Sequence, residues 1–363
     1  MSIYRLTQNV FRVLPLLFLG LYGTRAASQD ASFRQLGASP MLNNPALTGV
    51  VDGQLRLELN YQEIYTRLTT EQAYRSVAAS VDFRRPVRRG NFAGIGLVVQ
   101  HDQAGSSDYV RSQGLISGSY QQQIAGTGRG SRSAHYLSGG AQLGLGQRGF
   151  DLNKVWFSEQ YFVDATTREA YLDRSLPSGE RFAGMSGDPY VDINAGVAWF
   201  ATLGDRRSAY LGAAAYHLSE PNVSPVPGLE DVLYRRYVLH GGGELPLADG
   251  FSTVLPSFRV SWQGPAQSAL AGASLRYTQR AWREVALRLG GYGQLTGREG
   301  DRFGLASVLL LVALEMESVQ ISASYDLRTG GLRSLTNARG GFELSFVYRQ
   351  AANYPSRVRC PSF

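Results

Sequence analysis

The feature that most constrains this 363-residue chain is a two-residue rhythm of apolar and polar side chains. In residues 54–62 apolar residues alternate with charged or amide residues without interruption, and the rhythm returns repeatedly up to residues 342–348. Successive side chains of a β-strand point to opposite faces, so each segment has one apolar face and one polar face. Behind a secretory leader, a long series of such segments separated by turn residues is typical of an outer-membrane β-barrel.

The N-terminus has the pattern of such a leader. Two arginines precede an apolar run at residues 13–21, and residues 26–28 are small, as a signal peptidase requires. We therefore expect residues 1–28 to be a removable signal peptide and the mature chain to begin near Gln29. No cysteine lies at the cleavage site, so no lipid anchor is expected there, and Cys360 has no intramolecular partner for a disulfide.

The number of segments separates a barrel from a soluble β-sandwich. Composition does not, because 18% charged residues with 42 Gly and 20 Tyr suit both classes. No stretch after the leader approaches the roughly 18 apolar residues of a transmembrane helix. A sandwich has about seven to nine strands, whereas we find about fourteen, an even number as in single-chain bacterial barrels. They are predicted at residues 54–62, 76–83, 91–100, 109–121, 135–146, 190–200, 208–218, 236–245, 251–262, 269–277, 285–294, 303–314, 319–327 and 340–348.

This assignment gives an all-β chain with one membrane domain. We expect an N-terminal periplasmic segment at residues 29–53, an antiparallel transmembrane barrel at 54–348 and a C-terminal tail at 349–363. Leu57 and Leu59 are predicted to face lipid, and Arg56 and Glu58 to face the interior. Residues 307–314 are apolar on both faces, so the inner face of that strand is expected to be covered.

The predicted connections differ in length and charge. With periplasmic termini, the long segments at residues 149–189 and 219–235 lie outside the cell, and short turns, such as those at 84–90 and 315–318, lie in the periplasm. Arginines gather in the short turns, above all Arg84, Arg85, Arg88 and Arg89. Such a cluster is either a docking surface for an anionic periplasmic partner or an ordinary solvated turn.

Local motifs for chemistry are weak. Residues 144–149 match G-x-G-x-x-G by letter, but they close a predicted strand, and no helix follows to hold a pyrophosphate. The four histidines are far apart and lack the spacing of a zinc site. The charge of +7 comes from scattered arginines, which argues against nucleic-acid binding. We therefore predict no catalytic residue, metal or cofactor.

Four motifs, in order along nearly the whole mature chain, resemble those of the PorP/SprF family of type IX secretion and gliding proteins. The first is residues 31–35 followed by the N-P-A-x-x-G pattern at 43–49, and the second is residues 151–160. The third is residues 216–221, and the fourth is Tyr325-Asp326 followed by residues 340–345. The matching positions are Asn44, Pro45, Ala46, Gly49, Phe157, Gln160, His217, Leu218, Pro221, Tyr325, Asp326, Gly340, Gly341, Phe342 and Glu343. Each also has a purely architectural interpretation, such as a turn or a barrel corner.

The chain departs from the family pattern in several places. Leu36 stands where an aromatic residue is usual, Leu47-Thr48 replaces Tyr-Ala, and Ser158-Glu159 replaces Gly-Asp. The tail also extends beyond the closing strand. These differences leave open whether the chain is a core component or a paralogue dedicated to one secreted cargo.

The resemblance implies a non-enzymatic outer-membrane protein, in contact with lipid, that acts in secretion, gliding or surface anchoring of cargo. Its expected partners are periplasmic ring and peptidoglycan-binding components and the C-terminal domain of a secreted protein. Two other functions remain: a channel or transporter for small solutes, which requires an open polar lumen, and a lipid-modifying barrel enzyme, which requires a Ser/His/acid cluster at the outer leaflet.

Overall fold

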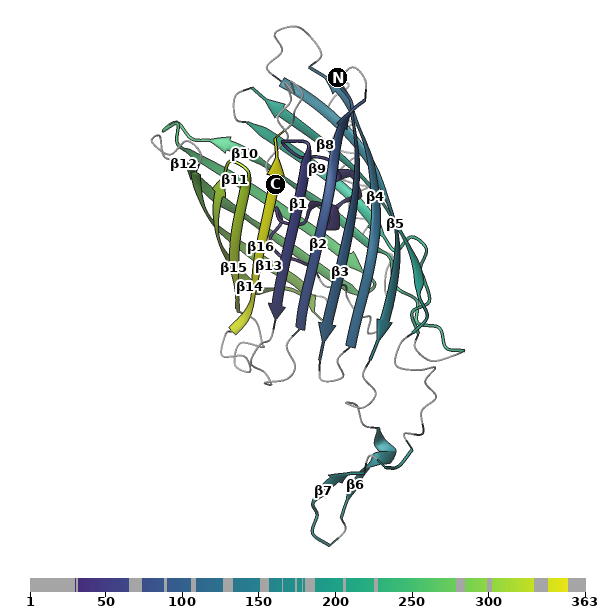
Figure 1. Cartoon of the computed structure of the whole chain (residues 1–363). Coiled ribbons are helices and arrows are strands. Elements are labelled where there is room, and N and C mark those ends of the chain that lie inside the picture. Colours follow the sequence, from purple (N-terminus) through teal and green to yellow (C-terminus); the bar gives the residue numbers. More distant parts are fainter. Residues whose placement is uncertain are drawn as a thin grey trace, which may run out of the picture.

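The alternating segments form antiparallel strands that close into a barrel (Figure 1). The computed structural model describes residues 30, 32–64, 74–87, 90–105, 109–126, 133–150, 157–164, 166–173, 175–177, 179, 187–204, 207–224, 228–278, 285–298, 302–329 and 339–351. The barrel strands are β1 (Leu55–Ile64), β2 (Tyr74–Pro86), β3 (Phe92–Ala104), β4 (Tyr109–Ala125), β5 (Ser133–Gly149), β8 (Tyr190–Leu203), β9 (Ser208–Tyr216), β10 (Arg236–Pro246), β11 (Ser252–Gln263), β12 (Ala266–Thr278), β13 (Val285–Arg298), β14 (Arg302–Met316), β15 (Val319–Arg328) and β16 (Arg339–Gln350).

The closed barrel has fourteen strands, and each of them corresponds to a predicted segment. β1 pairs with β16 along its whole length, from Leu55 opposite Gln350 to Ile64 opposite Gly341, so the wall has no free edge. Strand β9 ends at Tyr216 rather than at the predicted residue 218, because His217 adopts a left-handed backbone conformation with φ 57°. The predicted fold class is confirmed.

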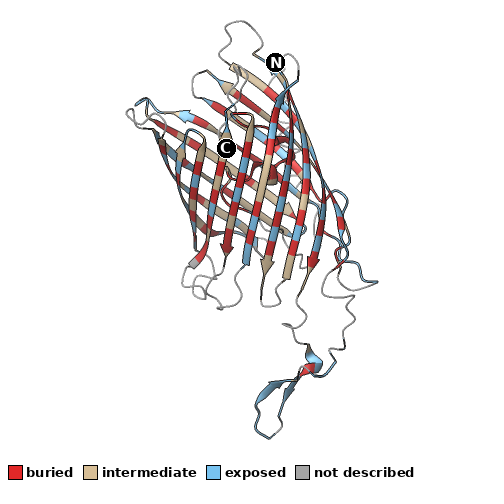
Figure 2. Ribbon diagram, viewed as in Figure 1, coloured by how far each residue is buried: buried red, intermediate tan, exposed pale blue. Residues whose placement is uncertain are grey.

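The two faces of the wall follow the sequence alternation (Figure 2). The side chains of Leu57 and Leu59 point outward and are 36% and 49% exposed, whereas Arg56 and Glu58 point inward and are 3% and 2% exposed. An apolar exterior of this kind suits contact with hydrocarbon. Among the described residues, no helix is long and apolar enough to cross a membrane.

The connections also divide as predicted. Because neighbouring strands are antiparallel, residues 150–189 and 217–235 emerge at one end of the barrel, which we call the loop end. Short connections, such as residues 87–91 and 317–318, lie at the opposite turn end. The compartment that each end faces remains a prediction.

A small structure at the loop end was not predicted. The 3-10 helix η3 (Ser158–Gln160) leads into a two-stranded hairpin of β6 (Tyr161–Val163) and β7 (Ala170–Leu172). We call residues 157–173 the loop-end hairpin. It projects away from the barrel at the bottom of Figure 1. Its strands have only three residues each, too few to give a clear period-two signal.

The segment before β1 fills the barrel interior, which corrects the prediction of a periplasmic segment at residues 29–53. Residues 30 and 32–53, here called the plug, include helix α2 (Pro40–Asn43) and the 3-10 helix η2 (Pro45–Leu47). Barrels of about eight strands are filled by their own wall side chains, but wider ones leave a lumen. A fourteen-stranded wall therefore leaves room for a chain segment inside it.

The plug forms an apolar core with the wall toward the turn end. Ala46, Leu47 and Val50 are buried against a group of aromatic side chains: Phe92, Tyr136 and Phe200. The rings of Tyr136 and Phe200 stack with centroids 5.0 Å apart. Elsewhere Leu36 packs against the cluster of Leu270, Tyr292 and Leu309, so the predicted cover over the inner face of residues 307–314 comes from the plug together with neighbouring wall side chains.

Candidate functional site

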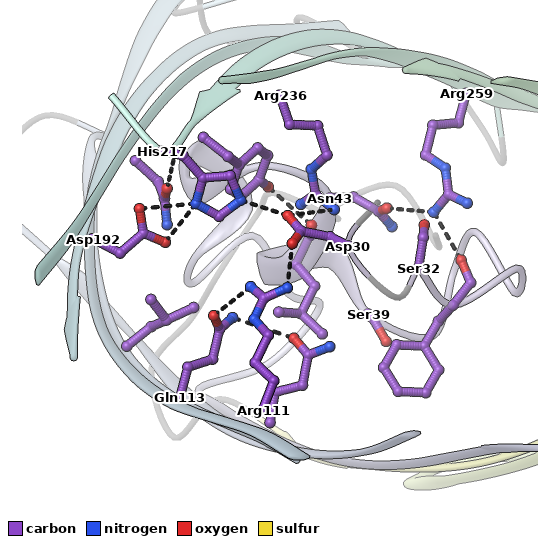
Figure 3. Close-up of a pocket in the computed structure, with 16 residues that line it drawn as sticks. Asp30, Ser32, Ser39, Asn43, Arg111, Gln113, Asp192, His217, Arg236 and Arg259 are labelled. Atoms are coloured by element: carbon purple, nitrogen blue, oxygen red, sulfur yellow. Dashed lines mark hydrogen bonds and ion pairs between the residues drawn. The ribbon is translucent and has the colours of Figure 1, made fainter. Parts of the chain in front are cut away.

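The plug is fastened to the wall near the loop end by Asp30. One carboxylate oxygen forms an ion pair with Arg111, and the other lies beside Nε2 of His217 (Figure 3). Nδ1 of His217 lies 3.0 Å from both carboxylate oxygens of Asp192, so the imidazole is held between two acids. Arg236 approaches Asp30 to 3.8 Å. We call Asp30, Arg111, Asp192, His217 and Arg236 the loop-end latch.

Charge in the latch shifts the pKa values of its two titratable groups outside the strands. Burial raises the pKa of Asp30, but Arg111, His217 and Arg236 outweigh this effect and hold the pKa well below its ordinary value. For His217 burial lowers the pKa, but hydrogen bonds to Asp192 and Asp30 and their negative charges produce a net rise. Each shift favours the charged form, so the latch is strongest with an ionised Asp30 and a protonated His217.

The next plug residues bind the closing strands. The backbone N–H groups of Arg34 and Gln35 donate to the two carboxylate oxygens of Glu343, at 2.7 and 2.9 Å. The Arg34 guanidinium forms an ion pair with Asp326. A buried carboxylate that accepts two consecutive backbone N–H groups satisfies donors that an irregular segment could not satisfy by itself.

Asn44 holds the centre of the plug. Its side-chain oxygen accepts a hydrogen bond from the backbone N–H of Ala46 at 2.9 Å and thereby caps η2. Its amide nitrogen lies 2.9 Å from the backbone oxygen of Val197 on β8 and 3.0 Å from Nε2 of His240. The wall residue that faces Asn44 is a glycine, and a Cβ on this Gly196 would lie 2.0 Å from the Asn44 side-chain oxygen.

A second ion pair fastens the plug near the turn end. Arg56 donates from Nε and Nη2 to Asp82 at 3.0 and 2.7 Å, and it also donates to the backbone oxygens of Leu47 and Val50. Asp82 in turn accepts the backbone N–H of Gly49 at 2.6 Å. Gly49 has φ 68°, a conformation that glycine adopts without strain. Both charged side chains are at most 3% exposed.

The structure brings together family-motif residues that lie far apart in the sequence. Asn44 and Gly49 are in the plug, and His217, Asp326 and Glu343 are the wall groups that bind it. Pro45 and Ala46 begin η2, and both are buried. The first motif, in the plug, and the third and fourth motifs, in the wall, therefore meet in one contact.

Other motif residues shape the wall around this contact. A Cβ on Gly340 would lie 1.9 Å from the backbone oxygen of Asp326, and one on Gly341 would lie 2.5 Å from that of Glu63. Phe342 packs beside Tyr61 with ring centroids 5.7 Å apart. Outside the contact, Leu218 and Tyr325 are exposed, and Pro221 accepts the backbone N–H of Leu233 at 3.0 Å.

The second motif belongs to the loop-end hairpin and does not join the plug. The side-chain oxygen of Gln160 accepts the backbone N–H of Phe157 at 3.2 Å, and its amide nitrogen donates to the backbone oxygen of Leu176 at 2.7 Å. The backbone oxygen of Gln160 accepts the N–H of Asp173 at 2.9 Å. Gln160 therefore closes the base of the hairpin.

The two described arginines of the arginine-rich turn, Arg84 and Arg85, lie on opposite faces of the wall. Arg84 is 1% exposed, and it donates to the backbone oxygen of Val51 at 3.0 Å and stacks 3.6 Å above the Phe92 ring. Its guanidinium is inside the barrel, so the prediction of a docking role for Arg84 needs correction. Arg85 is exposed on the outer face of the wall. Arg88 and Arg89 lie outside the described residues, as do residues 1–28 and Cys360.

The wall groups that hold the plug include residues that sequence reasoning missed: Asp82, Arg111, Asp192 and Arg259, with Asp30 and Arg34 in the plug itself. The only signal for the wall residues was a charged side chain at an inward position of an alternating strand. Across the part of the chain that the structure describes, no group of three or more His, Cys, Asp or Glu is arranged to hold a metal ion.

Comparison with solved structures finds outer-membrane barrels. The Ralstonia pickettii toluene transporter TbuX is 11% identical with a TM-score of 0.45, over 92% of this chain and 99% of that one. The CymD monoaromatic hydrocarbon channel is 12% identical with a TM-score of 0.44, over 90% and 96%. CdiB from Acinetobacter baumannii is 7% identical with a TM-score of 0.44, over 82% and 60%.

No curated protein matches the sequence. A family model does match, and it covers residues 25–348. That range includes the plug, every barrel strand up to Tyr348 and all four of the motifs identified above. The chain belongs to the family of type IX secretion system membrane proteins PorP/SprF.

Proposed function

We propose that this protein is a non-enzymatic outer-membrane scaffold of the type IX secretion or gliding machinery, which links the membrane to periplasmic partners or anchors a secreted cargo. Family membership supports the assignment to this machinery. The observation that favours a scaffold is the plug inside the lumen, which is held to the wall by the loop-end latch, by Asn44 and by the Arg56–Asp82 pair. A barrel closed in this way presents surfaces rather than a pore.

The two ends of the barrel offer different surfaces. With periplasmic termini, the turn end carries exposed Arg85 together with Arg88 and Arg89 of the sequence, which suit carboxylates of a ring or peptidoglycan-binding component. The loop-end hairpin faces the exterior, and its exposed Phe162 and Tyr171 suit an apolar surface on the C-terminal domain of a cargo. Outward leucines contact lipid.

The test is co-purification of the tagged protein from its native envelope. Replacing Arg85, Arg88 and Arg89 together with Gln should lower recovery of periplasmic components, because exposed pairs are individually weak and only a cluster contributes measurably. Replacing Phe162 and Tyr171 with Ala should lower recovery of cargo only. Arg168→Gln, a single change in the loop-end hairpin, is the control for the turn-end variant. If neither variant changes recovery, these two surfaces are not the docking sites.

A small-solute channel is the second candidate, because a cavity of about 580 Å³ opens in the lumen on the loop-end side of the plug. This function requires the plug to move. Planar-bilayer recordings of the parent decide between the two: steady conductance supports the channel, and conductance only after deletion of residues 32–50 supports the scaffold.

A further inference from the structure

The lumen contains a cavity, lined mainly by polar and charged residues, that the scaffold function does not use. It measures about 580 Å³, which lies within the range of about 300–1,000 Å³ that is common for small-molecule sites. Asp30, Ser32 and Arg34 of the plug contribute to it, and the remaining lining comes from the loop-end halves of the wall strands. Toward the turn end the plug packs against the wall in an apolar core, so the cavity lies on the loop-end side of that contact.

Positive charge dominates the cavity lining. Four arginines line it, Arg34, Arg111, Arg148 and Arg259, against two carboxylates, Asp30 and Asp102. Arg34 and Arg111 already have ion-pair partners, in Asp326 and Asp30. Among the described residues, no salt bridge within 4.0 Å involves Arg148 or Arg259. The cavity therefore has two guanidinium groups whose charge is not neutralised by direct contact.

Arg148 is the lining residue that most favours an anionic ligand. The residue is 9% exposed, and its Nε is buried with no hydrogen-bond partner among the described atoms. Nε of Arg111 is likewise buried with no hydrogen-bond partner among the described atoms. A buried donor with no acceptor is destabilising, and more so when it is charged. Both arginines line the cavity, and Arg148 has no ion-pair partner among the described residues, so its guanidinium is placed to bind an acceptor from outside the chain.

The rest of the lining defines the chemistry of that acceptor. Hydroxyl and amide groups surround the arginines, among them those of Ser32, Gln62, Tyr109, Gln294 and Thr296, and few of the lining residues are aliphatic. Guanidinium groups pair in bidentate fashion with carboxylate and phosphate, and hydroxyls and amides bind oxygen-rich molecules. We propose that this cavity binds a small oxygen-rich organic anion that carries carboxylate or phosphate groups, with Arg148 and Arg259 as its principal ligands.

Isothermal titration calorimetry on the full chain, folded in detergent micelles, tests the proposal with three probes. Citrate supplies carboxylates, glucose 6-phosphate supplies a phosphate, and glucose is the neutral comparator. We expect saturable binding of at least one anion, no binding of glucose, and weaker binding as sodium chloride is raised. The anion that binds more tightly identifies the preferred group. Absence of binding by both anions, or equal binding of glucose, would overturn the proposal.

Variants then locate the site. Arg148→Gln should weaken anion binding about tenfold or more, because a hydrogen bond to a charged group is lost. Arg148→Lys should fall between the parent and Arg148→Gln, since lysine keeps the charge but not the planar fork. Arg288→Gln is the matched control: Arg288 is also a buried lumenal arginine with an unpartnered Nε, but it lies near Glu315, outside the cavity.

Folding must be separated from binding in these variants. Arg259 donates to the backbone oxygen of Phe33 and to Asn43, so Arg259→Gln disturbs the plug as well as the cavity. No hydrogen bond from the Arg148 side chain to the plug occurs among the described residues, and Arg148→Gln should therefore keep the heat-modifiable migration of the folded barrel. Anion binding by folded Arg148→Gln that equals the parent's would exclude the cavity as the site.

Discussion

The plug and the loop-end hairpin both contain family-motif residues, but the protein holds them in opposite ways. The plug has little regular structure, and its polar groups are satisfied by wall residues such as Glu343, Asp82 and Val197. The loop-end hairpin satisfies its own backbone and leaves its aromatic side chains in solvent, with Phe162 stacked on Tyr171 at 5.7 Å. Motifs in the plug therefore stabilise the barrel, and motifs in the hairpin shape an exposed surface.

The largest loss in the free energy of unfolding should come from Asp82→Ala. The change removes the carboxylate that accepts two hydrogen bonds from the buried Arg56 guanidinium, which keeps only the longer contact of 3.4 Å between its Nε and Glu58 as a salt bridge among the described residues, and it removes the acceptor for the Gly49 N–H. Breaking a buried pair in this way costs about 3–5 kcal/mol. Urea unfolding in lipid vesicles measures it. Glu220→Ala breaks the exposed Arg235–Glu220 pair at the loop end and should cost about 0–1 kcal/mol. Equal losses of unfolding free energy in the two variants would contradict the difference between the buried plug contact and the exposed loop end.

Leu47→Ala tests the apolar half of the plug. Leu47 is buried in the cluster with Tyr136 and Phe200, and removal of a buried leucine side chain costs about 2–5 kcal/mol. Leu172→Ala makes the same chemical change on the loop-end hairpin, where the side chain is exposed, and should change the free energy of unfolding by less than about 0.5 kcal/mol. The same unfolding assay compares them, and a large effect of Leu172→Ala would show that the hairpin packs against the barrel.

Gly196→Ala probes the fit between the wall and Asn44. The added methyl group would meet the Asn44 side-chain oxygen, and such overpacking costs about 1–3 kcal/mol. Gly139→Ala is the control, because a Cβ there meets nothing within 4 Å. Limited proteolysis should also release the plug more readily in Gly196→Ala. If both alanine variants unfold like the parent, the plug tolerates displacement at its centre.

The smallest effect should be the pH dependence of the loop-end latch. The lowered pKa of Asp30 gives stability that is present above about pH 4 and is lost as pH falls through the folded-state pKa. The raised pKa of His217 gives stability that is complete below about pH 6.5 and is lost as pH rises through the folded-state pKa. The latch should therefore be strongest between about pH 4 and 6.5.

His217→Asn isolates the histidine contribution. Asparagine tolerates the left-handed backbone conformation at this position, so the change removes the titrating ring with little backbone strain. Unfolding measured from pH 6 to 9 should show a decline for the parent and for His101→Gln, an exposed control on β3, but a flatter profile for His217→Asn. A decline of the same size in all three would assign the pH dependence to other groups.

Much of the wall was predictable from the sequence because alternation is a local property. Leu57 and Arg56 take opposite faces whatever the rest of the chain does, once residues 54–62 form a strand. The motifs at His217, Asp326 and Glu343 were also visible. Their partners were not, because Asp30 and Arg34 lie about 200–300 residues away in sequence, and no local pattern encodes such a contact. The loop-end hairpin was missed because each of its strands is too short for a period.

The sequence by itself determined the strands, the faces of the wall, the even strand number and the family, since each depends on residue order over a few positions. Only the tertiary structure decided that residues 30 and 32–53 lie inside the barrel and that Arg84 is buried. It also placed Arg148 and Arg259 on one cavity. The physical reason is that closing the barrel creates a lumen whose polar groups must be satisfied by whatever the chain can bring to them, and closure joins β1 to β16 across the whole length of the sequence.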